Sequence, residues 1–166
     1  TLKKIGKLTD AEASFRKAIA LDPQFNSARN NLGVTLQNLG KLRQAEALFR
    51  ELILINSEIP EFHNNLGLTF YDLGKFKDSE ESFKKAIILN SSFASAYNNL
   101  GITLRKLRKP KEAEINFRKA ITLEPDFAGA HNNLANILKE FGNLEDAENS
   151  YETAIALKRD YREAML

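Results

Sequence analysis

The chain has 166 residues, of which 43% are hydrophobic and 28% are charged, with a formal net charge of +2. This balance is typical of an ordinary soluble domain and predicts neither a nucleic-acid partner nor a membrane partner held by bulk charge. The sequence contains no Cys, which excludes disulfides, thiolate metal sites and cysteine nucleophiles. No apolar run approaches the roughly 20 residues that span a bilayer.

A motif of two asparagines followed by leucine recurs every 34 residues, as NNLG at residues 30–33, 64–67 and 98–101 and as NNLA at residues 132–135. A fixed period of this length indicates a repeat architecture. We count Asn26 as place 1 of a repeat, so that Gly33 is place 8. A single array over residues 1–166 then has a partial repeat at 1–25 (mainly a second helix), full repeats at 26–59, 60–93, 94–127 and 128–161, and the start of another repeat at 162–166.

The first half of each repeat has the apolar pattern of a helix. Places 7, 11 and 14, such as Leu32, Leu36 and Leu39, hold large apolar residues, and steps of four and three put them on one stripe. Place 15 is where this helix is predicted to end, because its glycine favours the left-handed conformation of a helix end. These glycines are Gly6, Gly40, Gly74 and Gly142, and Arg108 takes the place in repeat 94–127.

The second half of each repeat predicts another amphipathic helix. Its stripe alternates small and large residues, as in Ala45, Phe49 and Leu52, so that helix backbones can approach closely at the alanines. A glutamate at place 21 has an arginine or lysine four residues on, which predicts ion pairs on a solvated outer face. The predicted pairs are Glu12–Arg16, Glu46–Arg50, Glu80–Lys84 and Glu114–Arg118.

These patterns resemble the tetratricopeptide repeat (TPR) family over the whole chain. The segment AYNNLGITLRKLRKPKEAEINFRKAITLEP, residues 96–125, matches the family's Leu-Gly and aromatic places, its Ala-aromatic-Ala second helix and its closing proline. The resemblance implies an all-α fold, a right-handed superhelix or α-solenoid of helix-turn-helix repeats. First helices would line its concave side and second helices its convex side. The family's tryptophan at place 4 is replaced here by Arg29, His63, Tyr97 and His131.

The asparagine pairs at places 5 and 6 are the candidate binding residues. On a helical wheel they lie with place 9 on the arc opposite the apolar stripe, so they are expected to face the groove. A primary amide can bond both the C=O and the N–H of an extended peptide, whatever its side chains. The predicted peptide-binding residues are Asn30, Asn31, Asn64, Asn65, Asn98, Asn99, Asn132 and Asn133, with Val34, Leu68, Ile102 and Asn136 at place 9.

Place 6 is also similar to the asparagine ladder of the TPR region of O-linked N-acetylglucosamine transferase. That likeness implies that Asn31, Asn65, Asn99 and Asn133 hold the backbone of an extended client. An alternative stays open, because asparagine at this place also bridges neighbouring helices. The fifth-place asparagines are expected to point more squarely into the groove.

The predicted function is a non-catalytic scaffold that binds a protein or peptide in extended conformation, without a cofactor or metal. Its only histidines, His63 and His131, occupy the packed arc two repeats apart and do not converge as metal ligands. Two alternatives remain: a client-recruiting module of a larger glycosyltransferase or sulfotransferase, or self-association end to end through helices that lack polar caps. The default expectation is a cytoplasmic location, with the parent N-terminus unassigned because Thr1 falls within a repeat.

Overall fold

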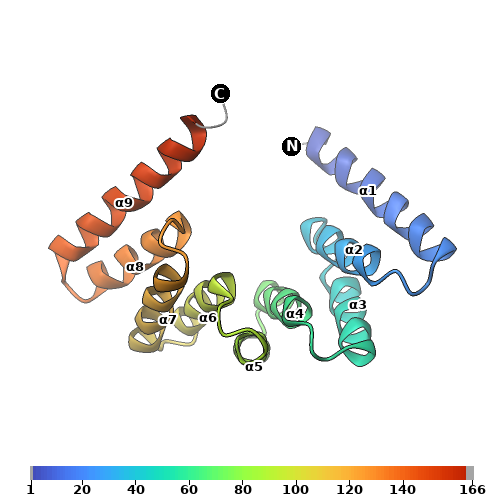
Figure 1. Ribbon diagram of the computed structural model, residues 1–166, viewed down its shortest axis with the longest axis horizontal. Helices are drawn as coiled ribbons and strands as arrows, with labels where there is room; N and C mark the ends of the chain where they lie inside the picture. The colour runs from blue at the N-terminus through green and yellow to red at the C-terminus, as the bar shows by residue number, and fades with distance from the viewer. Residues whose placement is uncertain (1, 164–166) are drawn as a thin grey trace. The chain divides into compact units, whose positions relative to one another are not determined.

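The computed structural model describes the backbone of residues 2–163 and the side chains of residues 5–158. Within these residues every regular element is an α-helix, and there is no strand (Figure 1). The helices are α1 (Leu2–Leu21), α2 (Asn26–Asn38), α3 (Leu42–Ile55), α4 (Pro60–Asp72), α5 (Phe76–Leu89), α6 (Ala94–Lys106), α7 (Pro110–Leu123), α8 (Ala128–Glu140) and α9 (Leu144–Glu163).

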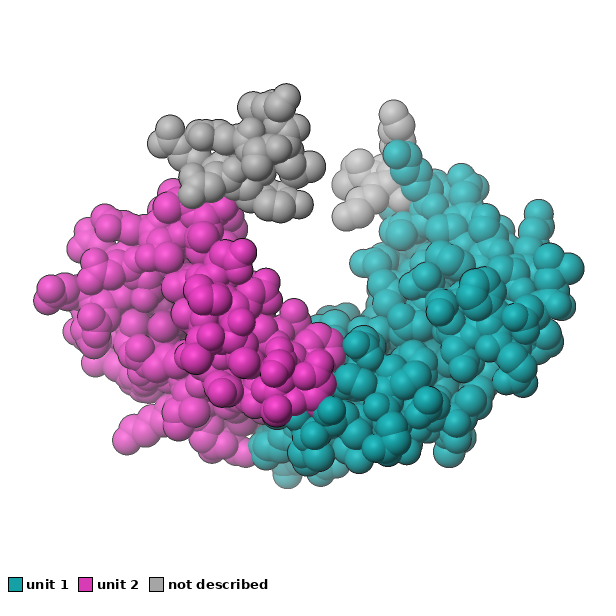
Figure 2. Space-filling model, in the orientation of Figure 1, with its two compact units in different colours: residues 1–89 teal, residues 90–166 magenta. Residues whose placement is uncertain are grey.

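The chain divides into two compact units, Thr1–Leu89 and Asn90–Leu166 (Figure 2). In the first unit α2 packs on α3 and α4 packs on α5; in the second, α6 packs on α7 and α8 packs on α9. First helices of successive repeats also touch, α2 with α4 and α6 with α8. This architecture confirms the predicted all-α solenoid of helix-turn-helix repeats. The further prediction, that residues 1–166 form a single continuous array, depends on how the two units are joined and stays a prediction.

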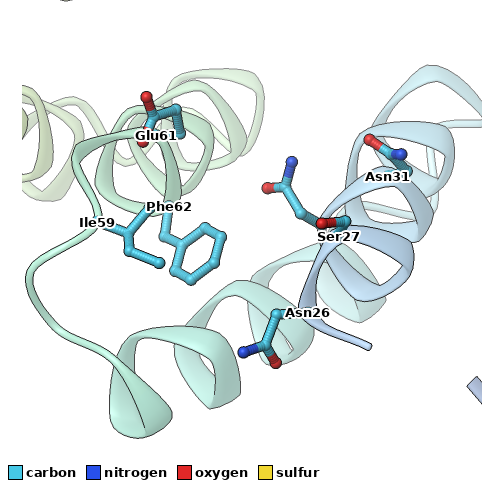
Figure 3. A pocket seen from close by; sticks show the side chains of 7 residues that line it. Asn26, Ser27, Asn31, Ile59, Glu61 and Phe62 are labelled. Carbon is cyan, nitrogen blue, oxygen red and sulfur yellow. The ribbon is translucent and has the colours of Figure 1, made fainter. Parts of the chain in front are cut away.

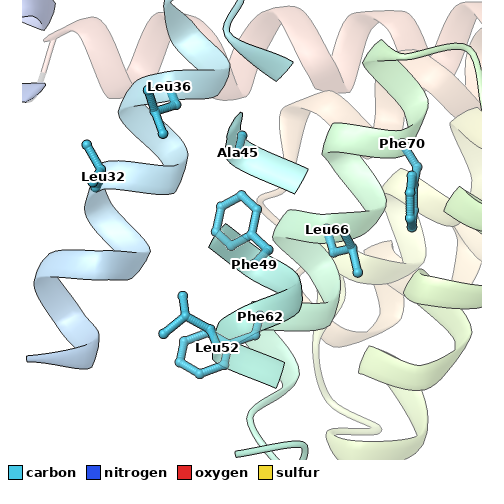
Figure 4. Packing of buried hydrophobic residues seen from close by; sticks show 8 residues of the cluster. All are labelled: Leu32, Leu36, Ala45, Phe49, Leu52, Phe62, Leu66 and Phe70. Carbon is cyan, nitrogen blue, oxygen red and sulfur yellow. The ribbon is translucent and has the colours of Figure 1, made fainter. Parts of the chain in front are cut away.

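The core of the first unit contains Phe49 among apolar side chains of α2, α3 and α4 (Figure 4). Phe49 on α3 is completely buried, and a Cβ added to Gly33 on α2 would lie 2.5 Å from the Phe49 ring atom Cζ. The ring therefore needs a glycine at place 8. The buried cluster consists of Leu32, Leu36, Ala45, Phe49, Leu52, Phe62, Leu66 and Phe70.

The same glycine–aromatic contact recurs along the chain, with one exchange in the last repeat. Added Cβ atoms at Gly67 and Gly101 would likewise lie 2.8 and 2.5 Å from the rings of the place-24 phenylalanines. In repeat 128–161, Ala135 stands at place 8 and Tyr151 at place 24. The Tyr151 hydroxyl donates a hydrogen bond of 2.8 Å to Oδ1 of Asn136. The final G of NNLG is thus explained by helix packing.

The turns between paired helices use the left-handed conformation predicted for place 15. Gly40, Gly74 and Gly142 have φ angles of +73°, +74° and +79°. Arg108 adopts a φ of +59° at the equivalent place, a conformation that costs an L-residue with a Cβ roughly 1–2 kcal/mol. Pro110 begins the next helix, where its missing N–H costs little. The turn geometry is therefore kept even where the glycine is absent.

The predicted helix end at Gly6 is wrong, because α1 runs through it from Leu2 to Leu21. Elsewhere the glycine turn lets a first helix of 13 residues, such as α2, fold back and bury a face on the second. A glycine inside a helix costs about 1 kcal/mol, which is less than the cost of interrupting several backbone hydrogen bonds.

At the other end, α9 crosses the predicted repeat boundary after Tyr161 and continues to Glu163, so no turn separates the predicted units there. Other second helices end where a place-31 side chain accepts a hydrogen bond from the N–H two residues on, as at Asp22, Asn56 and Asn90. Place 31 here is Lys158, which has no acceptor oxygen. Residues 164–166, assigned to a following first helix, lie outside the described residues.

Candidate functional site

Asparagines at places 5 and 6 form hydrogen bonds between successive first helices. Nδ2 of Asn65 on α4 donates to Oδ1 of Asn30 on α2 at 2.9 Å. The second unit repeats this bond, because Nδ2 of Asn133 on α8 donates to Oδ1 of Asn98 on α6, also at 2.9 Å. The sixth-place amide of one repeat thus bonds to the fifth-place amide of the repeat before it. This is the helix-bridging arrangement that the sequence left open as an alternative.

The fifth-place amides are less open than the helical wheel predicted. Asn64 and Asn98 are each only 7% exposed, and Asn30 and Asn132 are half-buried. A wheel places side chains around one helix, but it does not include the neighbouring first helix that covers this column. The prediction that these amides point squarely into an open groove is therefore wrong for the two buried ones.

Among the sixth-place asparagines, Asn31 differs from the others. Its side chain is exposed and makes no hydrogen bond to the part of the chain that the structure describes. Asn65, Asn99 and Asn133 are half-buried. The Asn31 backbone is fixed, since its carbonyl accepts a hydrogen bond of 2.8 Å from the Thr35 hydroxyl one turn on. The Asn31 side-chain amide is thus available for hydrogen bonds to a ligand, while its backbone is held within α2.

Within each unit, the place-9 residues form a half-buried strip on the same helices as the asparagines. Val34, Leu68 and Ile102 contribute apolar side chains. Asn136 is already occupied, because its Nδ2 donates to the Asn132 carbonyl at 2.8 Å and its Oδ1 accepts the Tyr151 hydroxyl. The strip therefore offers apolar contact in three repeats and an internally bonded amide in the fourth.

A cavity of about 380 Å³ opens beside Asn31 in the first unit (Figure 3). Ile59 and Phe62 lie on its α4 side, while Ser27 and Asn31 lie on its α2 side. Oδ1 of Asn26 is a buried atom with no hydrogen-bond partner in the described chain. The lining residues are Asn26, Ser27, Asn30, Asn31, Ile59, Glu61 and Phe62. Sequence reasoning identified the two asparagines at places 5 and 6 but missed the other five, because the cavity depends on how α2 and α4 pack.

The histidines tie the loops to the first helices. Nε2 of His63 lies 2.8 Å from the Ser57 carbonyl oxygen, and Nε2 of His131 lies 2.9 Å from that of Pro125. A carbonyl can only accept, so each ring donates this bond. This geometry agrees with the packing role predicted for place 4.

The outer surface carries the predicted ion pairs. Their N–O distances are 3.0 Å for Glu12–Arg16, 3.1 Å for Glu46–Arg50, 2.6 Å for Glu80–Lys84 and 2.8 Å for Glu114–Arg118. Sequence reasoning missed a second partner at place 16, just after the turn. Lys41 Nζ lies 2.7 Å from Glu12 and Lys75 Nζ lies 2.9 Å from Glu46. Each of these glutamates therefore joins its own helix to the start of the second helix of the next hairpin.

These contacts predict an acid-sensitive contribution to stability. Burial raises the pKa of Glu46, but hydrogen bonds from Lys75 and Arg50 outweigh it, so its pKa lies below the ordinary 4.5. A lowered folded-state pKa stabilises the protein above pH 4.5, and this stabilisation is lost as the pH falls through the folded value. At neutral pH we expect Glu46→Gln to lower the free energy of unfolding by roughly 0.5–1 kcal/mol, since both partners are solvated.

Urea denaturation of both proteins over a series of pH values measures this effect. The difference between wild type and Glu46→Gln should begin to shrink near pH 4.5 and disappear once the pH lies below the lowered folded-state pKa of Glu46. Glu51→Gln, which changes an exposed glutamate on the same helix that makes no ion pair in the described chain, is the matched control. A difference that persists unchanged in acid would contradict the role of the charge.

Within the described residues no three His, Cys, Asp or Glu side chains are grouped so that they could hold a metal ion. No helix in the described part of the chain has the length and apolar character needed to cross a membrane.

Three solved structures illustrate the fold that this chain shares. MamA aligns with a TM-score of 0.79 and 19% identity, over 97% of this chain and 94% of that chain. PilF of Pseudomonas aeruginosa aligns with a TM-score of 0.83 and 22% identity, over 93% and 70%. A thermophilic TPR protein of Thermus thermophilus aligns with a TM-score of 0.81 and 21% identity, over 99% and 93%. Identities this low support the fold alone.

The sequence matches no curated protein. Family models described as tetratricopeptide repeat match residues 1–25, 27–58, 60–93, 94–127 and 116–149. The narrower likeness to the transferase ladder stays a prediction. Because these family models together cover most of the sequence, the chain belongs to the tetratricopeptide repeat family, whose members are scaffolds for protein–protein contacts.

Proposed function

We propose that this chain is a non-catalytic scaffold that binds an extended segment of a partner protein across the first helices of unit Thr1–Leu89. The observation that carries the proposal is Asn31, an exposed amide without an internal partner beside a cavity of about 380 Å³. Asn65 and Asn133 are bonded to the preceding repeat, so we assign them chiefly to joining helices. The binding role predicted for all eight asparagines is thus concentrated on Asn31.

The geometry of stacked helices supports an extended ligand. Helices pack about 8–10 Å apart, and an extended chain advances about 3.3–3.6 Å per residue, so successive first helices meet roughly every third residue of the ligand. The Asn31 amide supplies a donor and an acceptor for one peptide group. Val34 and Leu68 supply apolar contact nearby on α2 and α4. Selection among partners would then come from the adjacent cavity.

A peptide screen tests this function. The full chain is screened against an unbiased array of dodecapeptides, and dissociation constants for selected peptides are measured by fluorescence anisotropy. Asn31→Ala is expected to weaken binding about two- to tenfold, because it removes a hydrogen-bonding amide that contributes about 0.5–1.5 kcal/mol. The urea midpoint should not change, since this amide has no internal partner among the described residues.

Asn149→Ala provides a matched control, because Asn149 is an exposed asparagine on α9 outside the proposed site. It should leave both affinity and the urea midpoint unchanged. Equal affinities for wild type and Asn31→Ala would contradict the proposed site, and failure to select any peptide would contradict extended-segment binding itself. The comparisons favour neither the recruiting-module nor the self-association alternative, and both stay predictions.

A further inference from the structure

We propose that the cavity beside Asn31 receives a long cationic side chain, lysine or arginine, from the bound segment. This inference rests on the proposed function and names the chemistry that the segment carries. The cavity combines three features on the α2–α4 pair: one carboxylate, amide side chains and an aromatic-aliphatic wall.

The polar groups of the cavity call for hydrogen-bond donors. Glu61 is the only charged residue that lines it, and in the described chain this carboxylate forms no ion pair. The Asn31 amide adds a further acceptor oxygen. A ligand that brings positive charge and several N–H groups would satisfy these acceptors, whereas an anion would face the Glu61 carboxylate.

The apolar part of the cavity suits the stem of such a side chain. Ile59 and Phe62 lie together on the α4 side, and the Phe62 ring projects toward α2 (Figure 3). Lysine and arginine place their methylene groups on apolar surface and keep the charged end in a polar environment. An aromatic ring also attracts a cation placed over its face. A cavity of about 380 Å³ falls within the range of roughly 300–1,000 Å³ that is usual for ligand pockets.

Corresponding residues in the second unit lack this chemistry. Gly129 takes the place of Glu61, and Ala130 takes the place of Phe62. The α6–α8 pair therefore has no counterpart of the Glu61 carboxylate or of the Phe62 ring at these places. The preference for a cationic side chain is predicted for the first unit only, so the second unit serves as an internal control.

Nuclear magnetic resonance of the ¹⁵N-labelled full chain can test the cavity directly with small probes. N-acetyl-arginine methylamide is compared with N-acetyl-citrulline methylamide, which has almost the same shape but no charge. The arginine probe should shift the backbone amide signals of Ser27, Asn31 and Glu61, and the citrulline probe should shift them less. The signals of Ser95, Asn99 and Gly129, their counterparts in the second unit, should not move.

Two variants separate the charge of Glu61 from its structural effect. Glu61 lies in the first turn of α4, where a negative charge also stabilises the helix through its dipole. Glu61 could therefore have a structural role even without a ligand. Glu61→Gln is expected to weaken the arginine probe about two- to fivefold, the range for a solvated ion pair, and to leave the citrulline probe unchanged. Glu51→Gln removes the same charge outside the cavity and should change neither titration.

Equal shifts by both probes, or an arginine titration that Glu61→Gln does not alter, would overturn the inference. The selected peptides give a second test, in which citrulline replaces their arginines and norleucine replaces their lysines. If these peptides still bind through Asn31 with unchanged affinity, the inference of a cationic side chain is overturned, whereas the proposed binding of an extended segment stands. If the arginine probe binds at Glu61 but no peptide is selected, the cavity chemistry is supported and extended-segment binding is overturned.

Discussion

Replacing Phe49 by alanine is expected to lower the free energy of unfolding by about 3–5 kcal/mol, as is typical for a large aromatic residue lost from a core. Phe49 is completely buried at the centre of the cluster that joins α2, α3 and α4 (Figure 4). Natural domains have only about 5–15 kcal/mol of stability, so this loss is a large fraction of the total. Urea denaturation followed by circular dichroism measures it, since the chain contains no Trp for fluorescence.

Leu54→Ala on the same helix is the matched control. Leu54 is 87% exposed, so its replacement should change the free energy of unfolding by less than about 0.5 kcal/mol. Similar losses for Phe49→Ala and Leu54→Ala would contradict the core assignment.

A second substitution tests the contact that explains the glycine. Alone, Gly33→Ala places a Cβ 2.5 Å from the Phe49 ring, and overpacking of this kind costs about 1–3 kcal/mol. With Phe49→Ala already present, the obstruction is gone, and Gly33→Ala should instead stabilise α2 by up to about 1 kcal/mol through helix propensity. The sign of the Gly33→Ala effect should therefore reverse between the two backgrounds. Additive effects would show that Gly33 and Phe49 do not interact.

The second large effect is expected at the bridging asparagines. Asn65→Ala should lower the free energy of unfolding by roughly 1–2 kcal/mol, because it removes the donor to Asn30 and leaves a half-buried acceptor unpaired. Asn133→Ala should have a similar effect through Asn98 in the second unit. Asn31→Ala should have almost none. Denaturant titrations of the three single variants measure these differences.

An isosteric replacement makes this test sharper. Aspartate has the shape of asparagine but, when ionised, no N–H to donate. Asn65→Asp should therefore destabilise at least as much as Asn65→Ala at neutral pH, whereas Asn31→Asp should be neutral for stability. If Asn65→Asp were as stable as the wild type, the hydrogen bond to Asn30 would not contribute.

Features that arise within one repeat could be predicted from the sequence. The 34-residue period, the stripes at places 7, 11 and 14 and the pairing of Glu46 with Arg50 depend only on the spacing of residues along helices. The structure confirms the helices and their pairs. Gly6 was an exception, because α1 continues through it as one helix, and a single glycine inside a helix costs only about 1 kcal/mol.

Features that arise between repeats were beyond sequence reasoning. Lys75 reaches Glu46 across 29 positions, and Asn65 meets Asn30 across 35. Each contact depends on the distance and angle between neighbouring hairpins. The same geometry decides which amides are covered and where the cavity opens. The sequence therefore identified the asparagine columns, but it could not show that Asn31 differs from Asn65.

The exchange in the last repeat has a consequence for the modularity of this chain. Its two hairpin types fill the same interior volume differently, with glycine against phenylalanine or with Ala135 against Tyr151, whose hydroxyl then bonds to Asn136. Chimeras that join sequences between whole repeats preserve these matched pairs. A crossover inside a hairpin would set an alanine against a phenylalanine, as in Gly33→Ala, or leave a tyrosine hydroxyl without its asparagine. Recombination of the last repeat with another repeat is therefore expected to succeed between whole repeats and to fail at the turn inside a hairpin.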